Sequence, residues 1–309
     1  MRTLAKALLP LAALSAVVFA QAPAHVAEGA KREGTLSLYT SLAPTESKPL
    51  ADAFEKKYDV RVQLWRGLSE EVVQRTITEA KGRRYAVDVV ETNGPEMEMI
   101  AREKLLGAGW SPDRLNLYVV GYNTAKVKRT EIPATYEGFT DPKWKGRIAL
   151  EATDSEWMAT VIKSEPGNKG MDLMRKLAAL QPALRKGHVL LASLVAAGDV
   201  QVGLAMYNSN IETLKRKGAP IDFVPVQPVV ARPQGIGVAR NAPHPNAAQL
   251  FRDFVLSGEG QKLFESMGRT PVKVTSQTNR FPFTLIDPAT VLDESAKWEG
   301  IWNDLFIRR

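Results

Sequence analysis

Oxygen-bearing side chains lie where short apolar runs of the chain end. Glu91, Asp154 and Tyr207 each lie at or just after the end of such a run. Carboxylate and phenolate oxygens are ligands that hard cations prefer, so these three residues are the predicted metal ligands. Glu151 and Glu156 flank Asp154 and would add further oxygen atoms to the site.

Serine and arginine residues near predicted helix starts point to a second chemistry, anion binding. Ser41 and Ser69 each lie near such a start, where unpaired backbone N–H groups and the helix dipole favour negative charge. Arg66 adds a planar guanidinium that suits carboxylate or phosphate. The predicted ligand-binding residues are Thr40, Ser41, Arg66, Ser69, Thr92, Asn93, Thr153, Asp154, Ser155, His188, Tyr207 and Asn208.

Several of these residues have ordinary structural alternatives. Ser69, like Asn210, suits a helix N-cap. Arg66 suits a solvated surface, and a lone histidine such as His188 is usually structural. Tyr207 differs, because a phenol at the carboxyl end of a strand is expected to face a cleft.

Catalytic motifs are absent from the sequence. It has no Gly-x-Ser-x-Gly elbow, no His-Glu-x-x-His pair and no phosphate-binding loop, and its three histidines are scattered. Binding without catalysis is therefore expected, and no cofactor is required. The alternative is a secreted two-lobed enzyme that acts on a small anionic substrate.

Strand-like and helix-like runs alternate in the first third of the chain. Three strand-loop-helix units in succession predict a parallel sheet whose loops gather at one edge. The predicted strands are 35–39, 60–65 and 87–90, and the helices that follow them are 49–58, 70–81 and 96–105.

Two further runs are predicted to join two lobes. Leu117–Val127 lies between segments that each look like a complete α/β unit, and Gly235–Arg240 would bring the chain back. A cleft between two lobes is where α/β proteins hold small ligands. The predicted division is 25–118 plus 232–272 for lobe 1, and 119–231 plus 273–309 for lobe 2.

Composition excludes some functional classes. The 309 residues are 44% hydrophobic and 24% charged, which is typical of a globular protein. The net charge is +7, but Lys and Arg are interspersed with Asp and Glu, so no nucleic-acid partner is expected. Cysteine is absent, which excludes disulfides and thiolate metal sites.

The N-terminus has the pattern of a secretory signal peptide. Arg2 and Lys6 precede the apolar run Ala7–Ala20, which is followed by small residues and is too short for a membrane span. Residues 1–24 are therefore predicted to be a signal peptide, cleaved after Ala20 or Ala24. The expected location is the periplasm.

Three motifs support a family resemblance: Asp141–Ile148 opening the second lobe, Leu194–Asp199, and Leu256–Gln261. With them, the chain resembles the periplasmic solute-binding proteins of ABC importers, in the subgroup that includes the ferric-ion-binding proteins. The resemblance implies a two-lobed α/β fold of type II, each lobe a mostly parallel sheet flanked by helices. It also implies a monomer that closes on a small molecule or metal chelate and then docks on an ABC permease.

The resemblance is weaker for the ligand. Ferric-binding relatives hold iron with a His in the first loop, a Glu in the third loop and paired tyrosines. The matching positions here are Ala43, Asn93 and Tyr207, which is followed by Asn208. The expected ligand is therefore ferric iron in a chelated or anion-assisted form, or a small anionic solute such as a phosphonate or sugar phosphate.

Two segments depart from the relatives' pattern. Relatives bind an anion at the turn that corresponds to Asp154–Glu156, but acidic side chains at this turn disfavour an anion here. The segment between Leu106 and Leu117 is shorter than in relatives, which have an extra strand or loop near the hinge.

Overall fold

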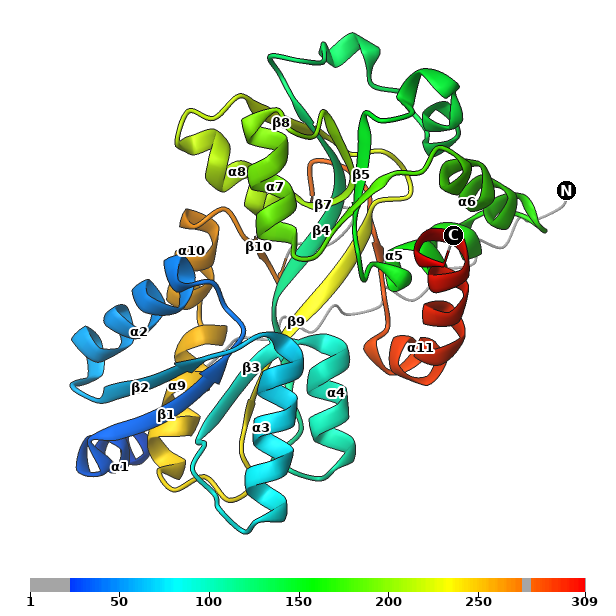
Figure 1. Ribbon diagram of the computed structural model, residues 1–309. Helices are drawn as coiled ribbons and strands as arrows, with labels where there is room; N and C mark the ends of the chain where they lie inside the picture. The colour runs from blue at the N-terminus through cyan, green and yellow to red at the C-terminus, as the bar shows by residue number, and fades with distance from the viewer. Residues whose placement is uncertain (1–22, 274–278, 309) are drawn as a thin grey trace, which may run out of the picture.

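Two lobes lie one above the other, and two long strands join them (Figure 1). The computed structural model describes residues 23–273 and 279–308, so most of the predicted signal peptide lies outside the described residues. Within these ranges no helix is long and apolar enough to cross a membrane. The joining strands, β4 (Ser111–Asn123) and β9 (Val230–Val238), pair antiparallel with each other.

The joining strands begin earlier than the sequence predicted. β4 starts at Ser111 instead of Leu117, so most of the segment that looked short beside its relatives is strand. β9 starts at Val230 instead of Gly235. The earlier start was not predicted, because Pro233 and its polar neighbours interrupt the strand pattern. The predicted crossing and return are otherwise confirmed.

One continuous sheet runs through both lobes, in the order β2-β1-β3-β9-β4-β7-β5-β6. The outer strands of each lobe are parallel, and the pairs that involve β4 and β9 in this order are antiparallel. The remaining strands are β1 (Thr35–Thr40), β2 (Arg61–Arg66), β3 (Val89–Asn93), β5 (Ile148–Glu151), β6 (Ala183–Arg185), β7 (Val202–Tyr207), β8 (Ile221–Val224), β10 (Thr270–Pro271) and β11 (Thr284–Leu285).

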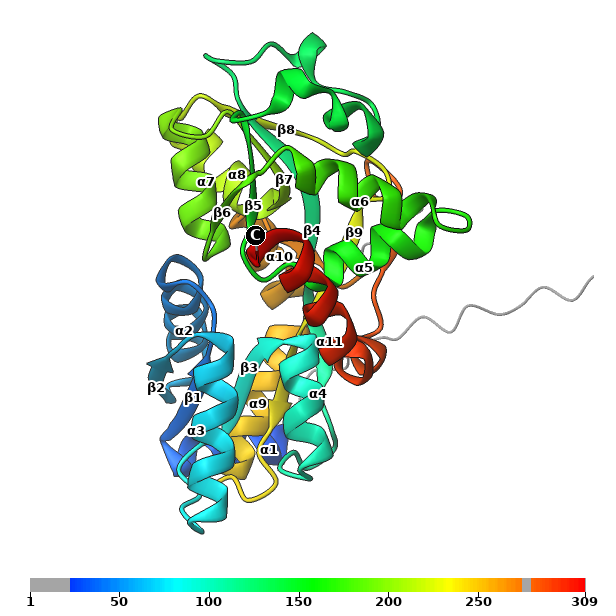
Figure 2. The ribbon, with the colours of Figure 1, turned by 45° about the vertical axis from the view of Figure 1, so that its right-hand side comes forward.

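Helices flank the sheet in both lobes (Figures 1 and 2). In the first lobe they are α1 (Ala24–Glu33), α2 (Pro44–Tyr58), α3 (Ser69–Lys81), α4 (Gly94–Arg102), α9 (Pro245–Leu256) and α10 (Gly258–Ser266). In the second lobe they are α5 (Ser155–Ser164), α6 (Lys169–Ala179), α7 (His188–Ala197) and α8 (Asn208–Arg216). The chain ends in α11 (Pro288–Trp302), followed by a turn of π-helix over Asn303–Ile307.

Each lobe has its own hydrophobic core. In the first lobe, Phe54 of α2 packs edge-on against Phe251 of α9, with ring centroids 4.9 Å apart. In the second lobe, Trp144 and Trp157 are fully buried, and Trp157 packs against Tyr136. Separate cores allow each lobe to move as a unit about the joining strands.

Helix α11 contacts both lobes (Figure 2). Trp298 and Trp302 join the core of the second lobe, and the indole N–H of Trp302 donates to the Ala152 carbonyl. On the other side, Asp293 forms an ion pair with Arg102 of α4, 2.5 Å away. The C-terminal helix therefore ties the second lobe to the first.

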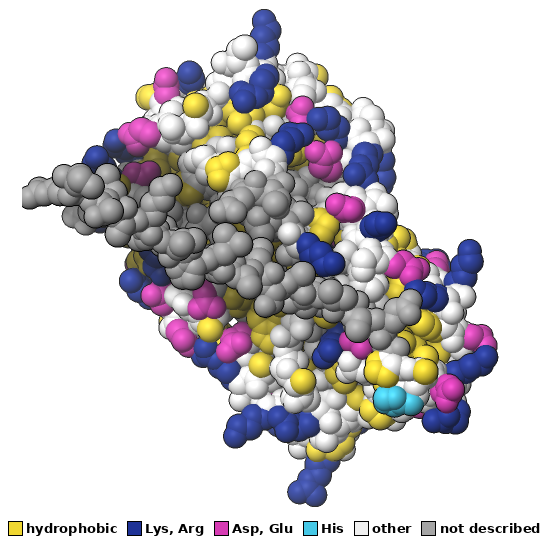
Figure 3. All heavy atoms as spheres, turned by 180° about the vertical axis from the view of Figure 1, so that it is seen from behind, with side chains coloured by type: hydrophobic (Ala, Val, Ile, Leu, Met, Phe, Trp, Pro, Cys, Tyr) yellow, Lys and Arg dark blue, Asp and Glu magenta, His cyan; other side chains and the backbone are white. Residues whose placement is uncertain are grey.

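Positive and negative side chains are intermingled on the face seen in Figure 3. Lys and Arg lie beside Asp and Glu over both lobes, without a broad area of one sign. This arrangement is that of a solvated mixed surface, in keeping with the interspersed charges of the sequence.

Candidate ligand-binding cleft

A cleft of about 1190 Å³ lies between the lobes, and we call it the interlobe cleft. The first residues of six helices, α2, α3, α4, α5, α7 and α8, border or line it. This follows from the topology, because the carboxyl ends of parallel strands lead into helix starts at one edge of a sheet. Of the predicted ligand-binding residues, those that line the cleft are Ser41, Arg66, Ser69, Asn93, Thr153, Asp154, Ser155, His188 and Tyr207.

Four predicted site residues lie behind the cleft wall: Thr40, Thr92, Asn208 and Glu91. Glu91 is 1% exposed, accepts a hydrogen bond from Thr40, and pairs with Arg114 at 2.7 Å. The Asn208 side chain accepts from the backbone N–H of Leu117 at 3.3 Å. The contacts of Glu91, Thr40 and Asn208 are all within the protein.

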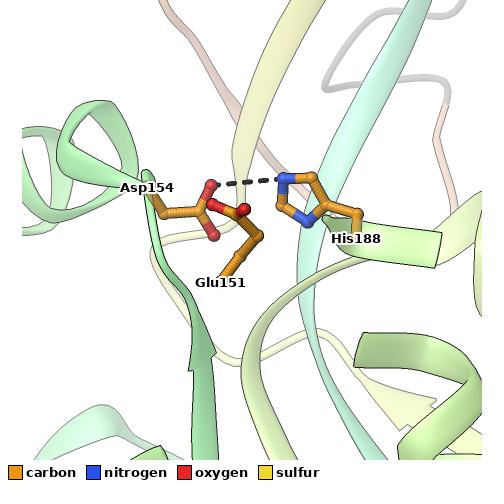
Figure 4. A group of neighbouring side chains, drawn as sticks. All are labelled: Glu151, Asp154 and His188. Atoms are coloured by element: carbon orange, nitrogen blue, oxygen red, sulfur yellow. Dashed lines mark ion pairs between the residues drawn. The ribbon is translucent and has the colours of Figure 1, made fainter. Parts of the chain in front are cut away.

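Glu151, Asp154 and His188 converge on the second-lobe wall (Figure 4). They come from the end of β5, the N-cap of α5 and the first residue of α7. One possible ligand atom from each lies within 4.8 Å of the others, and Nε2 of His188 is 3.2 Å from Oδ1 of Asp154. Two carboxylates and an imidazole at this spacing form a set of oxygen and nitrogen donors that suits a metal ion.

Hydrogen bonds hold this cluster only in part. Glu151 accepts from the backbone and hydroxyl of Thr153, and from the backbone of Gly187 at 2.8 Å. Oδ2 of Asp154 and Nδ1 of His188 are buried without a hydrogen-bond partner. Burial raises the pKa of Asp154 to about 6, although His188 opposes the shift. The cluster therefore has two unused polar atoms.

Two phenols lie beside the cluster. The ring of Tyr207 stacks on His188, and its hydroxyl lies 3.4 Å from that of Tyr118. Tyr118 donates to Glu156 at 2.6 Å. Burial raises the pKa of Tyr207 to about 12, so this phenol is neutral unless a cation displaces its proton.

Arg232 also lines the cleft, although no sequence pattern pointed to it. Its Nη1 donates to the hydroxyl of Tyr207 at 3.1 Å, and its Nη2 donates to Glu96 of α4 at 3.4 Å. Its Nε is 2.8 Å from Glu156 of α5, but the N–H does not point at that oxygen. Burial raises the pKa of Glu96, although Arg232 opposes the shift. Arg232 thus contacts carboxylates from both lobes.

The first-lobe wall contains the predicted hydroxyl and guanidinium groups. Ser69 is the first helical residue of α3, and the predicted N-cap at Ser69 is wrong, because Leu68 occupies that position. The Ser69 hydroxyl instead accepts from the Asn93 amide at 2.6 Å. Arg66 is exposed to the cleft, and its Nε donates to the Leu42 carbonyl at 3.2 Å.

A second predicted cap is also displaced. Helix α8 begins at Asn208, with Tyr207 as its N-cap, so Asn210 lies inside the first turn and lines the cleft. β7 therefore ends at Tyr207 and α8 begins at the next residue, so regular structure holds the backbone on both sides of the Tyr207 phenol.

The cleft is acidic although the whole chain is basic. Nine Asp and Glu residues line it against five Lys and Arg residues, whereas the net charge of the chain is +7. Four of the nine surround Arg232 and His188 on or near the second-lobe wall: Glu96, Glu151, Asp154 and Glu156. This local excess of negative charge favours a ligand with a positive centre.

Comparison with known proteins identifies the family. The family model for bacterial extracellular solute-binding proteins matches residues 66–285. The chain belongs to this family. A relative in Serratia marcescens, an Fe(3+)-binding periplasmic protein, is 22% identical over 274 residues, which is 78% of this chain and 79% of that protein.

Solved structures of solute-binding proteins share the fold. Iron-bound HitA from Pseudomonas aeruginosa has a TM-score of 0.73 and 23% identity, over 88% of this chain and 99% of that one. AfuA from Actinobacillus pleuropneumoniae, with exogenous fructose-6-phosphate bound, has a TM-score of 0.72 and 22% identity, over 90% of this chain and all of that one. The predicted type II fold is thereby confirmed.

Membership of the family has direct consequences. The family binds solutes and is non-catalytic, so the alternative of a secreted enzyme is set aside. The chain is the binding protein of an ABC importer, which implies a small ligand and a permease partner. The family acts outside the inner membrane, as the signal peptide predicted.

Proposed function

We propose that this solute-binding protein captures ferric iron together with a small chelating anion. The observation that supports the metal is the convergence of Glu151, Asp154 and His188, with two of their polar atoms unpaired. Hard oxygen and imidazole donors suit Fe(III), and the acidic second-lobe wall favours a cation. Relatives named or solved as iron-binding proteins add support.

The size of the cleft supports a chelate over a bare ion. A volume of about 1190 Å³ is far more than one ion fills. In this arrangement the metal lies on the second-lobe wall, and its anion faces Ser41, Ser69 and Arg66 on the first-lobe wall. A ligand that contacts both walls favours closure by its differential affinity for the closed form.

Only part of the predicted metal site enters this proposal. Asp154 is a proposed ligand, and Tyr207 is close enough through its stack on His188 to be tested as one. Glu91 is not included, because Arg114 and Thr40 occupy its carboxylate behind the wall. Glu151 and His188 are the other two proposed metal ligands.

The test is a binding titration in the metal-depleted protein. Fe(III) citrate, citrate alone, and Fe(III) with phosphate are added, and affinity is measured by calorimetry and thermal shift. We expect tight stoichiometric binding only when Fe(III) and the anion are both present. Replacing His188 by Ala should weaken that binding by about tenfold or more, the scale of a lost metal ligand. Equal binding of citrate with and without Fe(III) would exclude the metal from the ligand.

A phosphorylated solute is the second candidate. One structural relative has fructose-6-phosphate bound, and the exposed guanidinium of Arg66 suits a phosphate. Metal-independent binding of fructose-6-phosphate, lost on Arg66→Ala, would favour this candidate.

A further inference from the structure

The two joining strands present a polar face to the floor of the interlobe cleft. Asn116 of β4 lies directly opposite Arg232 of β9, and Arg114 lies opposite Gln234. Directly opposite residues of an antiparallel pair point to the same face of a sheet. All four residues line the cleft, and we call them the hinge floor.

The other face of these strands is apolar. Leu115 and Leu117 alternate with the polar residues of β4, and they form a buried cluster with Val229 and Ala231. This period of two fixes the register, because a slip by one residue would turn the polar side chains into that cluster. The polar residues are therefore held at the cleft.

Three buried side-chain atoms of the hinge floor lack hydrogen-bond partners. They are Oδ1 of Asn116, Nε of Arg114 and Nε of Arg232, which lies 2.8 Å from Glu156 without a hydrogen bond to it. Asn116 as a whole is 6% exposed. Buried polar groups in proteins are nearly always paired, and leaving one unpaired is unfavourable. An unpaired acceptor directly opposite an unpaired donor, on the floor of a binding cleft, points to a ligand group that supplies both.

A hydroxyl group is such a partner. It can donate to Oδ1 of Asn116 while its lone pairs accept from the guanidinium of Arg232. A ligand carboxylate would fit this place less well, because Glu156 and Glu96 already offset the charge of Arg232. The hinge floor therefore suits a neutral group that both donates and accepts.

We propose that the hinge floor is a hydroxyl-recognition subsite, which binds a hydroxyl group of the anionic ligand. Asn116 is the specificity-determining residue and Arg232 is the donor opposite it. The inference rests on the proposed function for the nature of the anion. The hydroxyl can belong to a hydroxycarboxylate or to a polyol phosphate.

Matched ligand pairs test the subsite without any metal. Citrate is compared with tricarballylate, which lacks only the hydroxyl, and glycerol 3-phosphate is compared with propyl phosphate. Calorimetry on the iron-free protein should show about tenfold tighter binding for the hydroxylated member of at least one pair, the scale of one well-placed hydrogen bond. The pair that discriminates identifies the class of anion. Equal affinities within both pairs, or no binding by any of the four compounds, would overturn the proposal.

Variants then show which residue causes the preference for the hydroxylated ligand, which we call the discrimination. Asn116→Ala should abolish it, whereas Asn116→Asp keeps an acceptor oxygen and should retain it while weakening both members of a pair. Gln74→Ala removes an exposed amide at the cleft rim and should change nothing. Because the ratio is measured within each variant, a change in folding stability does not affect it. Discrimination that survives in Asn116→Ala would exclude Asn116 as its source.

The titrations test the metal proposal and the hinge-floor proposal independently of each other. If Fe(III) leaves every affinity unchanged but the hydroxyl preference is present, the metal proposal falls and the hinge floor stands. If Fe(III) strengthens binding at least tenfold but the two members of each pair bind alike in the iron-free titrations, the hinge floor falls and the metal proposal stands.

Discussion

The imidazole of His188 lies flat against the ring of Tyr207, with centroids 3.7 Å apart and planes 25° from parallel. The stack joins the proposed metal ligands to the hydrogen-bond network of Arg232, since Nη1 of Arg232 donates to the Tyr207 hydroxyl. A change in charge at His188 or at a bound metal therefore changes the electrostatic environment of the Tyr207 phenol. This contact makes Tyr207 the most direct spectroscopic reporter of the site.

Tyr207→Phe keeps the stack and removes only the hydroxyl. If the phenolate ligates iron, the wild-type protein should show a visible charge-transfer band with Fe(III), and the variant should lose both the band and about tenfold or more in affinity. Tyr118→Phe is the control, because that hydroxyl donates to Glu156 and should leave the band in place. Unchanged affinity in Tyr207→Phe would remove Tyr207 from the site.

Iron binding should weaken in acid through Asp154. Burial raises the pKa of this carboxyl to about 6, and a metal binds the carboxylate form. Above that pH no proton need be displaced from Asp154. Below it, each pH unit should cost up to about tenfold in affinity. The measurement is the affinity for Fe(III) citrate from pH 5 to 7.5, in the wild type and in Asp154→Asn. The ratio of the two affinities at each pH removes the effect of pH on iron in solution. A ratio that does not vary with pH would contradict this role.

Glu91 should be a stability residue. Its side chain is buried against Arg114, so Glu91→Gln leaves a buried guanidinium partly uncompensated and should cost about 3 kcal/mol in the free energy of unfolding. Asp113 still pairs with Arg114 and limits the loss. Urea unfolding of the iron-free protein gives the value, and exposed Glu70→Gln should lie within about 0.5 kcal/mol of wild type. Weaker iron binding by Glu91→Gln at unchanged stability would restore Glu91 as a metal ligand.

Glu91 and Asp154 show why the sequence located only part of the site. Both follow short apolar strands, and the carboxyl ends of such strands do gather at the cleft. Asp154 lines the cleft, whereas the Glu91 carboxylate pairs with Arg114. Arg114 lies opposite Gln234 in the paired strands, and no local sequence pattern reveals that position. Sequence patterns therefore predict the edge of the sheet where a side chain lies, but not its partner across the fold.

Arg232 was missed for a related reason. Its strand contains Pro233 and polar Gln234, so it lacked the β-branched run that marks a strand. On β4, Arg114, Asn116 and Tyr118 do alternate with leucines, and this pattern was the available signal. Only the pairing of the two strands shows that the polar residues form one surface at the cleft.

Arg269 should hold the two lobes together in the absence of ligand. It lies just before β10 and hydrogen-bonds both Glu46 of α2 and Ser209 of α8, which belong to different lobes. Arg269→Met removes both bonds, so the unliganded protein should open and its radius of gyration, measured by X-ray scattering, should increase. Ligand affinity should fall about tenfold, because the closed form becomes less populated.

Ser209→Ala separates this effect from simple destabilisation. It removes only the second-lobe partner and leaves buried Glu46 paired with Arg269, so the lobes should open with little loss of folding stability. Arg269→Met also leaves Glu46 buried and unpaired, which should lower the free energy of unfolding by about 3 kcal/mol. If Ser209→Ala leaves the radius of gyration and the affinity unchanged, Arg269 supports the first lobe alone and does not link the two.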